Sequence, residues 1–319
     1  MIYAGIDEAG YGPLLGPLCV GASAFALTSG DPMSRPDLWK LLDSGVCRAP
    51  KDARRRVAVA DSKKLKGVGG AGVHPLRHLE RGVLAFAGGD VPSSDAALFT
   101  RLGAAAHRSR APPWHGATLP APVALTADEA AIARNMVARA LERAGIATAH
   151  LSVSALDAPA FNALYGTLHN KASVNMSLVF DALRTIDHLR GTGPALVAID
   201  RQGGRAAYSD ALEAHVAHGA RVRVIEESDE RSSYEVGDGL FVTFEVEAET
   251  AHMPVALASM AAKLVRELFM RRLNRFFTER LPGLEPTAGY VTDGRRYLAE
   301  VKPLLATEGI PEAEFTRVV

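Results

Sequence analysis

The chain has 319 residues, of which 48% are hydrophobic and 23% are charged, and this balance excludes an intrinsically disordered protein. Lys and Arg together number 36, as do Asp and Glu, so the formal net charge is zero. A net charge of zero excludes a protein that binds nucleic acid by bulk positive charge alone, but it allows a local basic surface.

The N-terminal segment is predicted to form a β-hairpin. Apolar residues alternate with others over 2–7, and 18–27 follows a Gly/Pro turn as a second strand. Asp7 and Glu8 interrupt the first apolar run and no basic stretch precedes it, so it does not read as a signal peptide. The apolar stretch 14–27 is too short and too broken by Gly and Pro to span a membrane. We therefore expect a soluble, cytoplasmic protein.

The rest of the chain mixes helical and strand patterns, which indicates an α/β fold. Residues 82–124 are rich in Gly, Ala and Pro and are predicted to be irregular. We expect one domain over 1–319, with an irregular insert over about 66–145 and a C-terminal helical segment over about 268–319. The other predicted elements are a helix over 128–144 ended by Gly145, a strand over 150–156, a helix over 172–189, strands over 194–200, 220–228 and 239–249 with a turn at 231–234, and a long helix over 255–280.

Charge is segregated along the chain although the total cancels. Residues 48–66 hold eight basic residues against two acidic ones, and 263–280 hold six against two. Residues 226–249 hold nine acids and a single basic residue. Solvated surface is the simplest interpretation of each block. Together the blocks could also frame a cleft that takes a polyanion through metal ions.

Acidic residues stand at the ends of well-predicted elements. Asp7 and Glu8 end the first strand, Asp200 ends the strand 194–200, and Glu267 lies in the long helix. Ligands of α/β proteins commonly bind at strand ends. Carboxylates held close together repel unless a cation neutralises them, and their hard oxygen atoms suit Mg²⁺ or Mn²⁺. Surface acids without a ligand are the alternative interpretation of each position.

One face of the long helix is polar. At about 100° per residue, Ser259, Lys263, Arg266 and Glu267 fall within an arc of roughly 100°, and the opposite side is apolar. The start of this helix, PVALASMAA, is too apolar for an exposed segment. We expect it to pack on the sheet, with its polar face near the strand ends.

Several motifs resemble those of ribonuclease HII. Residues 7–14, DEAGYGPL, resemble the family's opening DEAGRGPLAGP, and 61–65, DSKKL, are identical to its second motif. Ile199 and Asp200 resemble its central strand and aspartate. Residues 258–267, ASMAAKLVRE, resemble its ASIxAKVxRD helix, and 289–292, GYVT, resemble its C-terminal GYxT turn. The motifs stand in the family's order.

The resemblance implies an RNase H-like fold, with a mixed sheet flanked by helices, and a metal-binding carboxylate quartet. It implies an endonuclease that hydrolyses the RNA strand of RNA–DNA hybrids by a two-metal mechanism, leaving 3′-OH and 5′-phosphate ends, with Mg²⁺ or Mn²⁺ as cofactor. It implies nucleic acid as the partner, and neither a membrane nor a protein partner is predicted. Carried over by motif, the catalytic and metal-binding residues are Asp7, Glu8, Asp200 and Glu267. The implied substrate-binding residues are Gly10, Tyr11, Gly12, Lys63, Lys64, Ser259, Lys263 and Tyr290.

The sequence departs from the family at several of these motifs, and among the departures Asp200 is followed by Arg201 in place of the usual Gly and the usual His downstream of the GYxT turn is missing. Tyr11 replaces an Arg, which removes a charged phosphate donor, and Glu267 stands where ribonuclease HII usually has Asp. Two alternatives therefore stay open. One is an RNase H-like nuclease with a different nucleic-acid substrate, and the other is a catalytically silent relative that binds nucleic acid.

Overall fold

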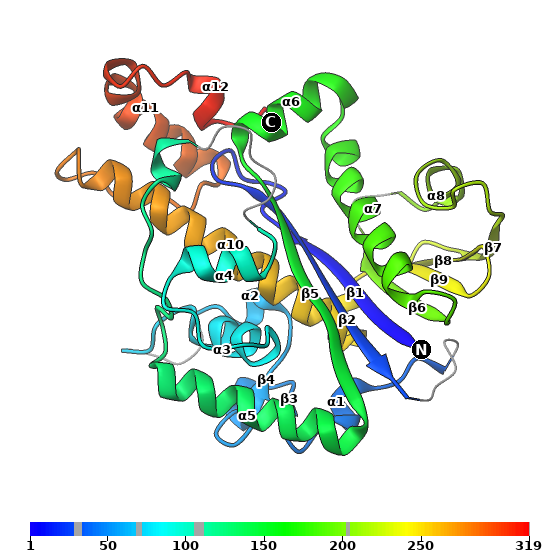
Figure 1. Ribbon diagram of the computed structural model, residues 1–319. Coiled ribbons are helices and arrows are strands. Elements are labelled where there is room, and N and C mark those ends of the chain that lie inside the picture. Colours follow the sequence, from blue (N-terminus) through cyan, green and yellow to red (C-terminus); the bar gives the residue numbers. More distant parts are fainter. Residues whose placement is uncertain (29–33, 68–71, 105–111, 202–204, 319) are drawn as a thin grey trace.

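The computed structural model describes the whole chain except residues 29–33, 68–71, 105–111, 202–204 and 319. Its centre is a mixed sheet of seven strands in the order β5-β2-β1-β6-β9-β8-β7, with helices on both faces (Figure 1). The α/β class and the mixed sheet flanked by helices are thereby confirmed.

The strands of this sheet are β1 (Ile2–Ala9), β2 (Leu18–Leu27), β5 (Ile146–Leu156), β6 (Ala195–Asp200), β7 (Val222–Glu227), β8 (Arg231–Val236) and β9 (Leu240–Glu245), and a separate pair is formed by β3 (Val46–Cys47) and β4 (Val57–Ala58). The longer helices are α3 (Arg77–Phe86), α5 (Ala127–Ala144), α6 (Ala158–Leu168), α7 (Lys171–Arg190), α10 (Met253–Thr278) and α11 (Val291–Thr307). The shorter ones are α1 (Leu38–Leu41), α2 (Ser62–Leu65), α4 (Asp95–Arg101), α8 (Ser209–His215), α9 (Ala248–Ala251) and α12 (Glu312–Phe315), with 3₁₀ turns at Pro50–Asp52 and Pro113–His115.

The sheet brings three strand ends to one edge. β1 runs antiparallel to β2, which confirms the predicted hairpin, and parallel to β6, with Ile6 opposite Ile199. β6 in turn runs parallel to β9. Parallel strands have their carboxyl ends at the same edge, so Asp7, which follows Ile6, and Asp200, which follows Ile199, lie side by side near that edge.

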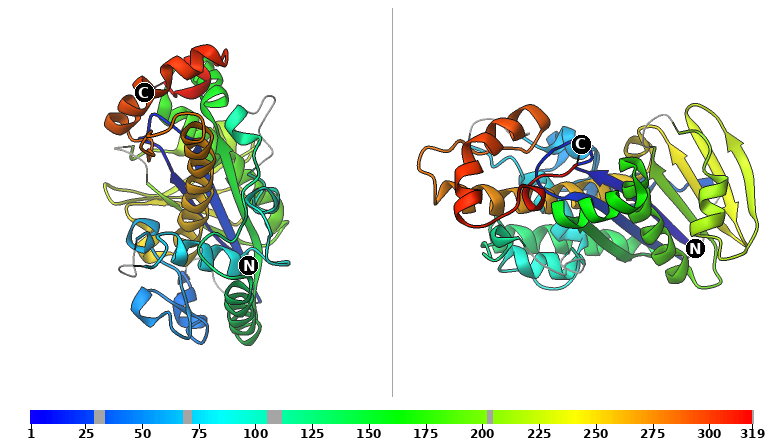
Figure 2. Two further views of the ribbon diagram at one scale, coloured as in Figure 1. Left: turned by 90° about the vertical axis from the view of Figure 1, so that its left-hand side faces the viewer. Right: turned by 90° about the horizontal axis from the view of Figure 1, so that it is seen from above.

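Each face of the sheet carries its own hydrophobic core. Tyr3 points to the face covered by α10 and by the group α3, α4 and α5, and its neighbours Ile2 and Ala4 point to the face covered by α6, α7 and α8 (Figures 1 and 2). This alternation is the period of two expected of a strand that is buried on both sides. A third core, built around Phe277 and Tyr297, joins the end of α10 to α11 and α12.

Helix α10 packs against the backbone of β1 and β2. A Cβ atom on Gly5 would lie 2.1 Å from the Val255 nitrogen, and one on Gly21 would lie 2.2 Å from the Ala258 oxygen. Only glycine permits this approach. The close contact sets the N-terminal half of α10, which carries Ser259, beside the end of β1.

Two parts of the chain differ from the sequence expectations. The predicted irregular insert over 66–145 contains α3 and α4 as well as α5, and buried residues of these helices, such as Val83 and Leu98, join the core under α10. Residues 231–234, expected to be a turn, belong to strand β8, which pairs with β7 and β9. In both places tertiary packing overrides the local Gly, Pro and Ser signals.

The helices predicted at 128–144 and 172–189 are confirmed as α5 and α7. Helix α5 has a complete capping box at Thr126 and Glu129 and ends at Gly145, whose φ is 63°. None of the helices in the described part of the chain has the length and hydropathy needed to cross a membrane.

Candidate active site

Three carboxylates from two neighbouring strands converge at the sheet edge. Asp7 and Glu8 come from β1 and Asp200 from the end of β6, and one oxygen of each lies within 4.8 Å of the others. Asp7 is buried, with 7% of its surface exposed, and the other two are half-buried. Oxygen atoms this close together have the spacing of ligands that share a metal ion.

The electrostatics of this cluster disfavour three bare charges. Burial, and then the neighbouring charges of Glu8 and Asp200, raise the pKa of Asp7 well above its usual value. Burial, and then the charges of Glu249 and Glu8, raise the pKa of Asp200 to about 7. Both shifts have the sign expected for like charges gathered in a site of low polarity. A bound cation would reverse the balance and hold the carboxylates ionised.

Hydrogen bonds fix the carboxylates in place. The Glu8 backbone N–H donates to Asp7 Oδ1 over 2.7 Å, and the Ala248 N–H donates to Asp200 Oδ1 over 3.1 Å. The Ser259 side chain hydrogen-bonds Asp7. The Ser259 hydroxyl also lies 3.0 Å from the Ser62 hydroxyl, so α10 and the DSKKL segment meet at the cluster.

A fourth acid at this site, Glu249, was not singled out from the sequence. It lies in α9, directly after β9, lines the same cavity as the other three, and contacts Asp200 closely enough to raise its pKa. Its Oε2 atom is buried and has no hydrogen-bond partner among the described residues. The available signal was its place at the end of a predicted strand, the same rule that selected Asp200.

Glu267, predicted as the fourth member of the quartet, lies elsewhere. Its Oε1 accepts from Lys66 Nζ over 2.8 Å and lies 3.0 Å from Lys263 Nζ, and Glu267 is absent from the three-acid cluster and from the lining of its cavity. Ser259, which touches Asp7, stands eight residues earlier, or about 12 Å along the helix axis. The motif resemblance selected Glu267, and the structure pairs it with Lys66 and Lys263.

Most of the predicted substrate-binding residues surround one cavity. It has a volume of about 270 Å³ and is open to solvent beside the acids. The predicted residues that line it are Gly10, Tyr11, Gly12, Lys63, Ser259, Lys263 and Tyr290. Lys64 is exposed on α2 and is not among the lining residues. The cavity therefore combines a carboxylate cluster with two lysines and two aromatic rings, a composition suited to a phosphate backbone that approaches bound cations.

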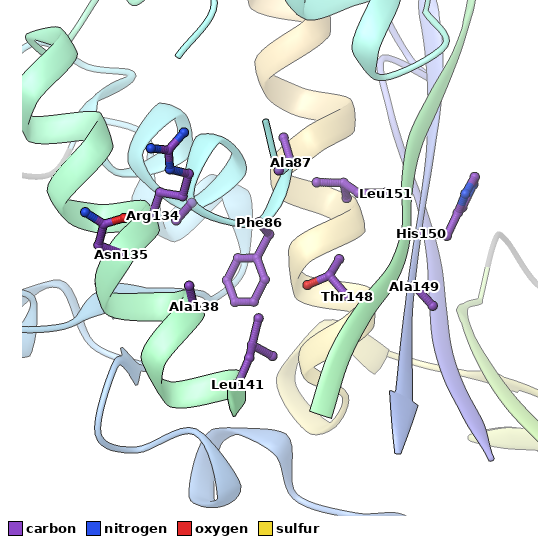
Figure 3. A pocket seen from close by; sticks show the side chains of 12 residues that line it. Phe86, Ala87, Arg134, Asn135, Ala138, Leu141, Thr148, Ala149, His150 and Leu151 are labelled. Carbon is purple, nitrogen blue, oxygen red and sulfur yellow. The ribbon is translucent and has the colours of Figure 1, made fainter. Parts of the chain in front are cut away.

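A larger cavity than the one beside the acids lies elsewhere in the protein. A cavity of about 520 Å³ lies between α5 and the edge strand β5, where Phe86, Leu141 and Thr148 face one another (Figure 3). Its lining contains Arg134 and His150 but no carboxylate. It therefore offers no set of oxygen ligands, and the chemistry points to the smaller cavity.

Comparisons with known proteins found similar solved structures at low sequence identity, but no matching family model and no curated protein that matches at a significant level. Among solved structures, the chain is similar to the ribonuclease HII of Archaeoglobus fulgidus, determined as a complex with PCNA, at 17% identity and a TM-score of 0.43, covering 100% of this chain and 94% of that one. It is similar to the ribonuclease H2 of Pyrococcus horikoshii OT3 at 15% identity and a TM-score of 0.46, covering 99% and 92%.

A third similar structure is Bst-RNase HIII in complex with Mn²⁺, at 16% identity and a TM-score of 0.42, covering 99% of this chain and 66% of that one. At TM-scores below 0.5 the similarity does not establish a shared activity. The function must be judged from the geometry of the acidic site.

Proposed function

We propose that this protein is a metal-dependent nuclease that hydrolyses phosphodiester bonds. The observation that carries the proposal is the convergence of Asp7, Glu8 and Asp200, whose oxygens lie within 4.8 Å of one another at the end of two parallel strands. Three carboxylates at this distance are costly without a cation. Lysines and aromatic rings beside them supply contacts for a polyanion.

The residues present fit a divalent cation. All the candidate ligands are carboxylate oxygens, which suit Mg²⁺ or Mn²⁺ better than softer metals, and neither Cys19 nor Cys47 is among the residues that line the cavity. The buried Oε2 of Glu249, which has no hydrogen-bond partner among the described residues, is a further ligand for an ion held beside Asp200. We therefore assign the metal site to Asp7, Glu8, Asp200 and Glu249.

The roles of the side chains follow from their positions. When bound, a pair of divalent ions supplies a water of lowered pKa and stabilises the leaving oxygen, so that the products carry 3′-OH and 5′-phosphate ends. Asp7, Glu8, Asp200 and Glu249 would hold and orient the cations. Ser259 fixes Asp7 through its hydrogen bond. Lys63 and Lys263 line the cavity and attract the phosphate backbone.

The proposed substrate is the RNA strand of an RNA–DNA hybrid. Support comes from the joint presence of DEAGYGPL, DSKKL and GYVT, the residues of which meet around one cavity at Gly10, Lys63 and Tyr290. A nuclease acting on a different nucleic acid is the second candidate. The observation that favours it is Tyr11, which lines the cavity where the motif has a charged Arg.

The test is cleavage of end-labelled substrates. The full chain is incubated with RNA–DNA hybrid, duplex RNA and duplex DNA, each with Mg²⁺, with Mn²⁺ and with a chelator. Cleavage of the hybrid alone, abolished by the chelator and by Asp200→Asn, is the expected result. Cleavage of DNA alone would select the second candidate. Absence of cleavage on all three substrates, with retained binding, would identify a silent nucleic-acid-binding protein and overturn the proposal.

A further inference from the structure

Two arginines lie buried directly beneath the loop 10–15, which forms one wall of the cavity. Arg266 projects from α10 and is 1% exposed, and Arg317 comes from the C-terminal segment and is 2% exposed. Neither forms a salt bridge with a carboxylate among the described residues. Three of their N–H groups, Arg266 Nε and Arg317 Nε and Nη1, have no hydrogen-bond partner there.

Burying two arginines without a carboxylate partner lowers the stability of the fold. Burial, followed by the neighbouring charge of Arg266, lowers the pKa of Arg317 to about 9. A buried cation without a counterion destabilises a fold by several kcal/mol in typical proteins. The matched case on the same helix is Arg272, which is also buried but donates to both oxygens of Asp95 over 2.6 Å. The fold can therefore pair a buried arginine with an acid, and does not do so beneath this loop.

The arginines engage the carbonyl groups of the loop. Arg317 Nη2 donates to the Gly10 oxygen over 2.6 Å and to the Pro13 oxygen, and Arg266 Nη2 donates to the Leu15 oxygen over 3.3 Å. Arg266 Nη2 also donates to the Ala288 oxygen over 3.0 Å, beside the GYVT turn. The carbonyl groups of Gly10, Pro13 and Leu15 are thereby held by two positively charged side chains.

The loop leaves no room for another conformation at its start. Gly10 has a φ of 88°, and a Cβ atom there would lie 2.6 Å from Arg266 Nε. The backbone N–H groups of Leu14 and Leu15 both donate to the Gly289 oxygen. The shape of the loop therefore depends on its contacts with α10, the turn before α11 and the C-terminal segment.

A third cation stands at the rim. Lys171, at the start of α7, lies with its Nζ atom 5.0 Å from the centre of the Tyr11 ring. Together with Arg266 and Arg317, it places positive charge around a loop whose own motif Arg is replaced by Tyr11. The basic side chains that contact this loop thus come from parts of the chain distant in sequence from it.

The C-terminal segment, residues 313–318, is held in place by hydrogen bonds to Asn162. Asn162 of α6 donates through Nδ2 to the Ala313 and Thr316 oxygens, each over 2.8 Å, and accepts from the Val318 N–H over 2.8 Å. Leu15 also forms an isolated bridge with Thr316. Residues 313–318 are therefore tied to α6 on one side and to the loop on the other.

We propose that Arg317 is a positioning residue for substrate binding. It holds the loop 10–15 in its shape through hydrogen bonds to the loop carbonyls and places a positive charge beside the loop. The inference rests on the proposed nuclease function. It makes the C-terminal segment a functional part of the site, although no motif of the sequence points to it. Arg317 does not touch the carboxylate cluster, so its effect falls on the affinity for the phosphate backbone and not on the chemical step.

The test is steady-state cleavage of the preferred substrate by Arg317→Gln at several salt concentrations. We expect KM to rise about tenfold while kcat changes less than about twofold, and the salt dependence of KM to become shallower. Arg317→Lys keeps the charge but loses the planar, forked guanidinium group, so its KM should lie between those of the wild type and Arg317→Gln. Asn162→Ala, which loosens the segment without removing charge, should raise KM without changing the salt dependence.

Arg272→Gln is the matched control, because it removes a similarly buried arginine remote from the loop. It should lower the melting temperature and leave KM unchanged. Equal KM for Arg317→Gln and wild type, or an equal rise in KM for Arg272→Gln, would overturn the inference. If Arg317→Gln does not fold, unchanged KM in both Arg317→Lys and Asn162→Ala would overturn it. Wild-type protein that neither binds nor cleaves nucleic acid would instead overturn the proposed function and this inference with it.

Discussion

Two acidic sites lie at helix α10, and their neighbours shift the pKa values of the acids in opposite directions. At the end of β1 and β6, Asp7 and Asp200 form no salt bridge with a basic residue in the described part of the chain, and burial and neighbouring acids raise the pKa values of both. Glu267 lies on α10 about two helical turns after Ser259 and is also mostly buried. Burial opposes its ionisation, but the charge of Lys263 and the hydrogen bond from Lys66 hold its pKa below the usual value.

The difference separates a site that needs an external cation from one that has internal cations. Glu267 is already satisfied by two lysines, so a metal ion would have to displace them. Asp7 and Asp200 have no such lysine pair among the described residues, so the strand-end cluster would gain more from a divalent ion than Glu267 would. A buried acid is therefore a better metal-site candidate when its pKa is raised by other acids than when lysines lower it.

The largest effect is expected from removing a ligand of the cluster. Asp7→Asn or Asp200→Asn should reduce cleavage by at least about a thousandfold, because each removes a charge that holds the cations. The variant should remain folded, since Asn keeps the size and the hydrogen-bond acceptor. Cleavage rates with Mn²⁺, together with circular dichroism, check this. Near wild-type activity in either variant would remove that residue from the metal site.

Glu249→Gln should have the next largest effect, a loss of about 10- to 100-fold, the range typical of groups that tune a metal site. Part of the loss should be recovered at high Mn²⁺ concentration, because the remaining carboxylates still bind the ion more weakly. A titration of activity against metal concentration measures this shift. Unchanged metal dependence would mean that Glu249 is only a neighbour of Asp200.

Glu267→Gln should change the cleavage rate by less than about tenfold. Its metal dependence should stay that of the wild type, because its carboxylate is already paired with Lys66 and Lys263. The melting temperature should fall by a few degrees as the two lysines lose their partner. If this variant were as inactive as Asp7→Asn, the contrast between the two sites would be wrong, and Glu267 would belong to the metal site.

The smallest effect concerns stability and pH. Asp200 titrates near 7 in the metal-free fold but near 3.9 in an unfolded chain, so the folded state binds more protons between these values. Stability of the metal-free protein should therefore fall as pH rises from about 4 to about 7. Asp200→Asn should remove this contribution, so that its melting temperature at pH 8 exceeds that of the metal-free wild type by a few degrees.

Thermal melts with and without Mn²⁺ check the prediction. Added Mn²⁺ should raise the melting temperature of the wild type, by mass action on the folded state, and should leave Asp200→Asn nearly unchanged. If the melting temperatures of the two metal-free proteins changed with pH in the same way, the pKa of Asp200 would not be raised in the folded state.

The sequence by itself determined the α/β class, the hairpin and the two long helices α5 and α7, because each depends on local periodicity and caps. It also placed Asp7, Glu8 and Asp200 at strand ends, because buried strands that finish in an acid are visible as patterns. The tertiary structure decided the rest. It brought Glu249 of α9 to the cavity of the three acids and paired Glu267 with two lysines, since contacts between segments far apart in the sequence decide which side chains meet. It also brought Arg317 beneath the loop 10–15, a contact between residues about 300 positions apart that no local pattern encodes.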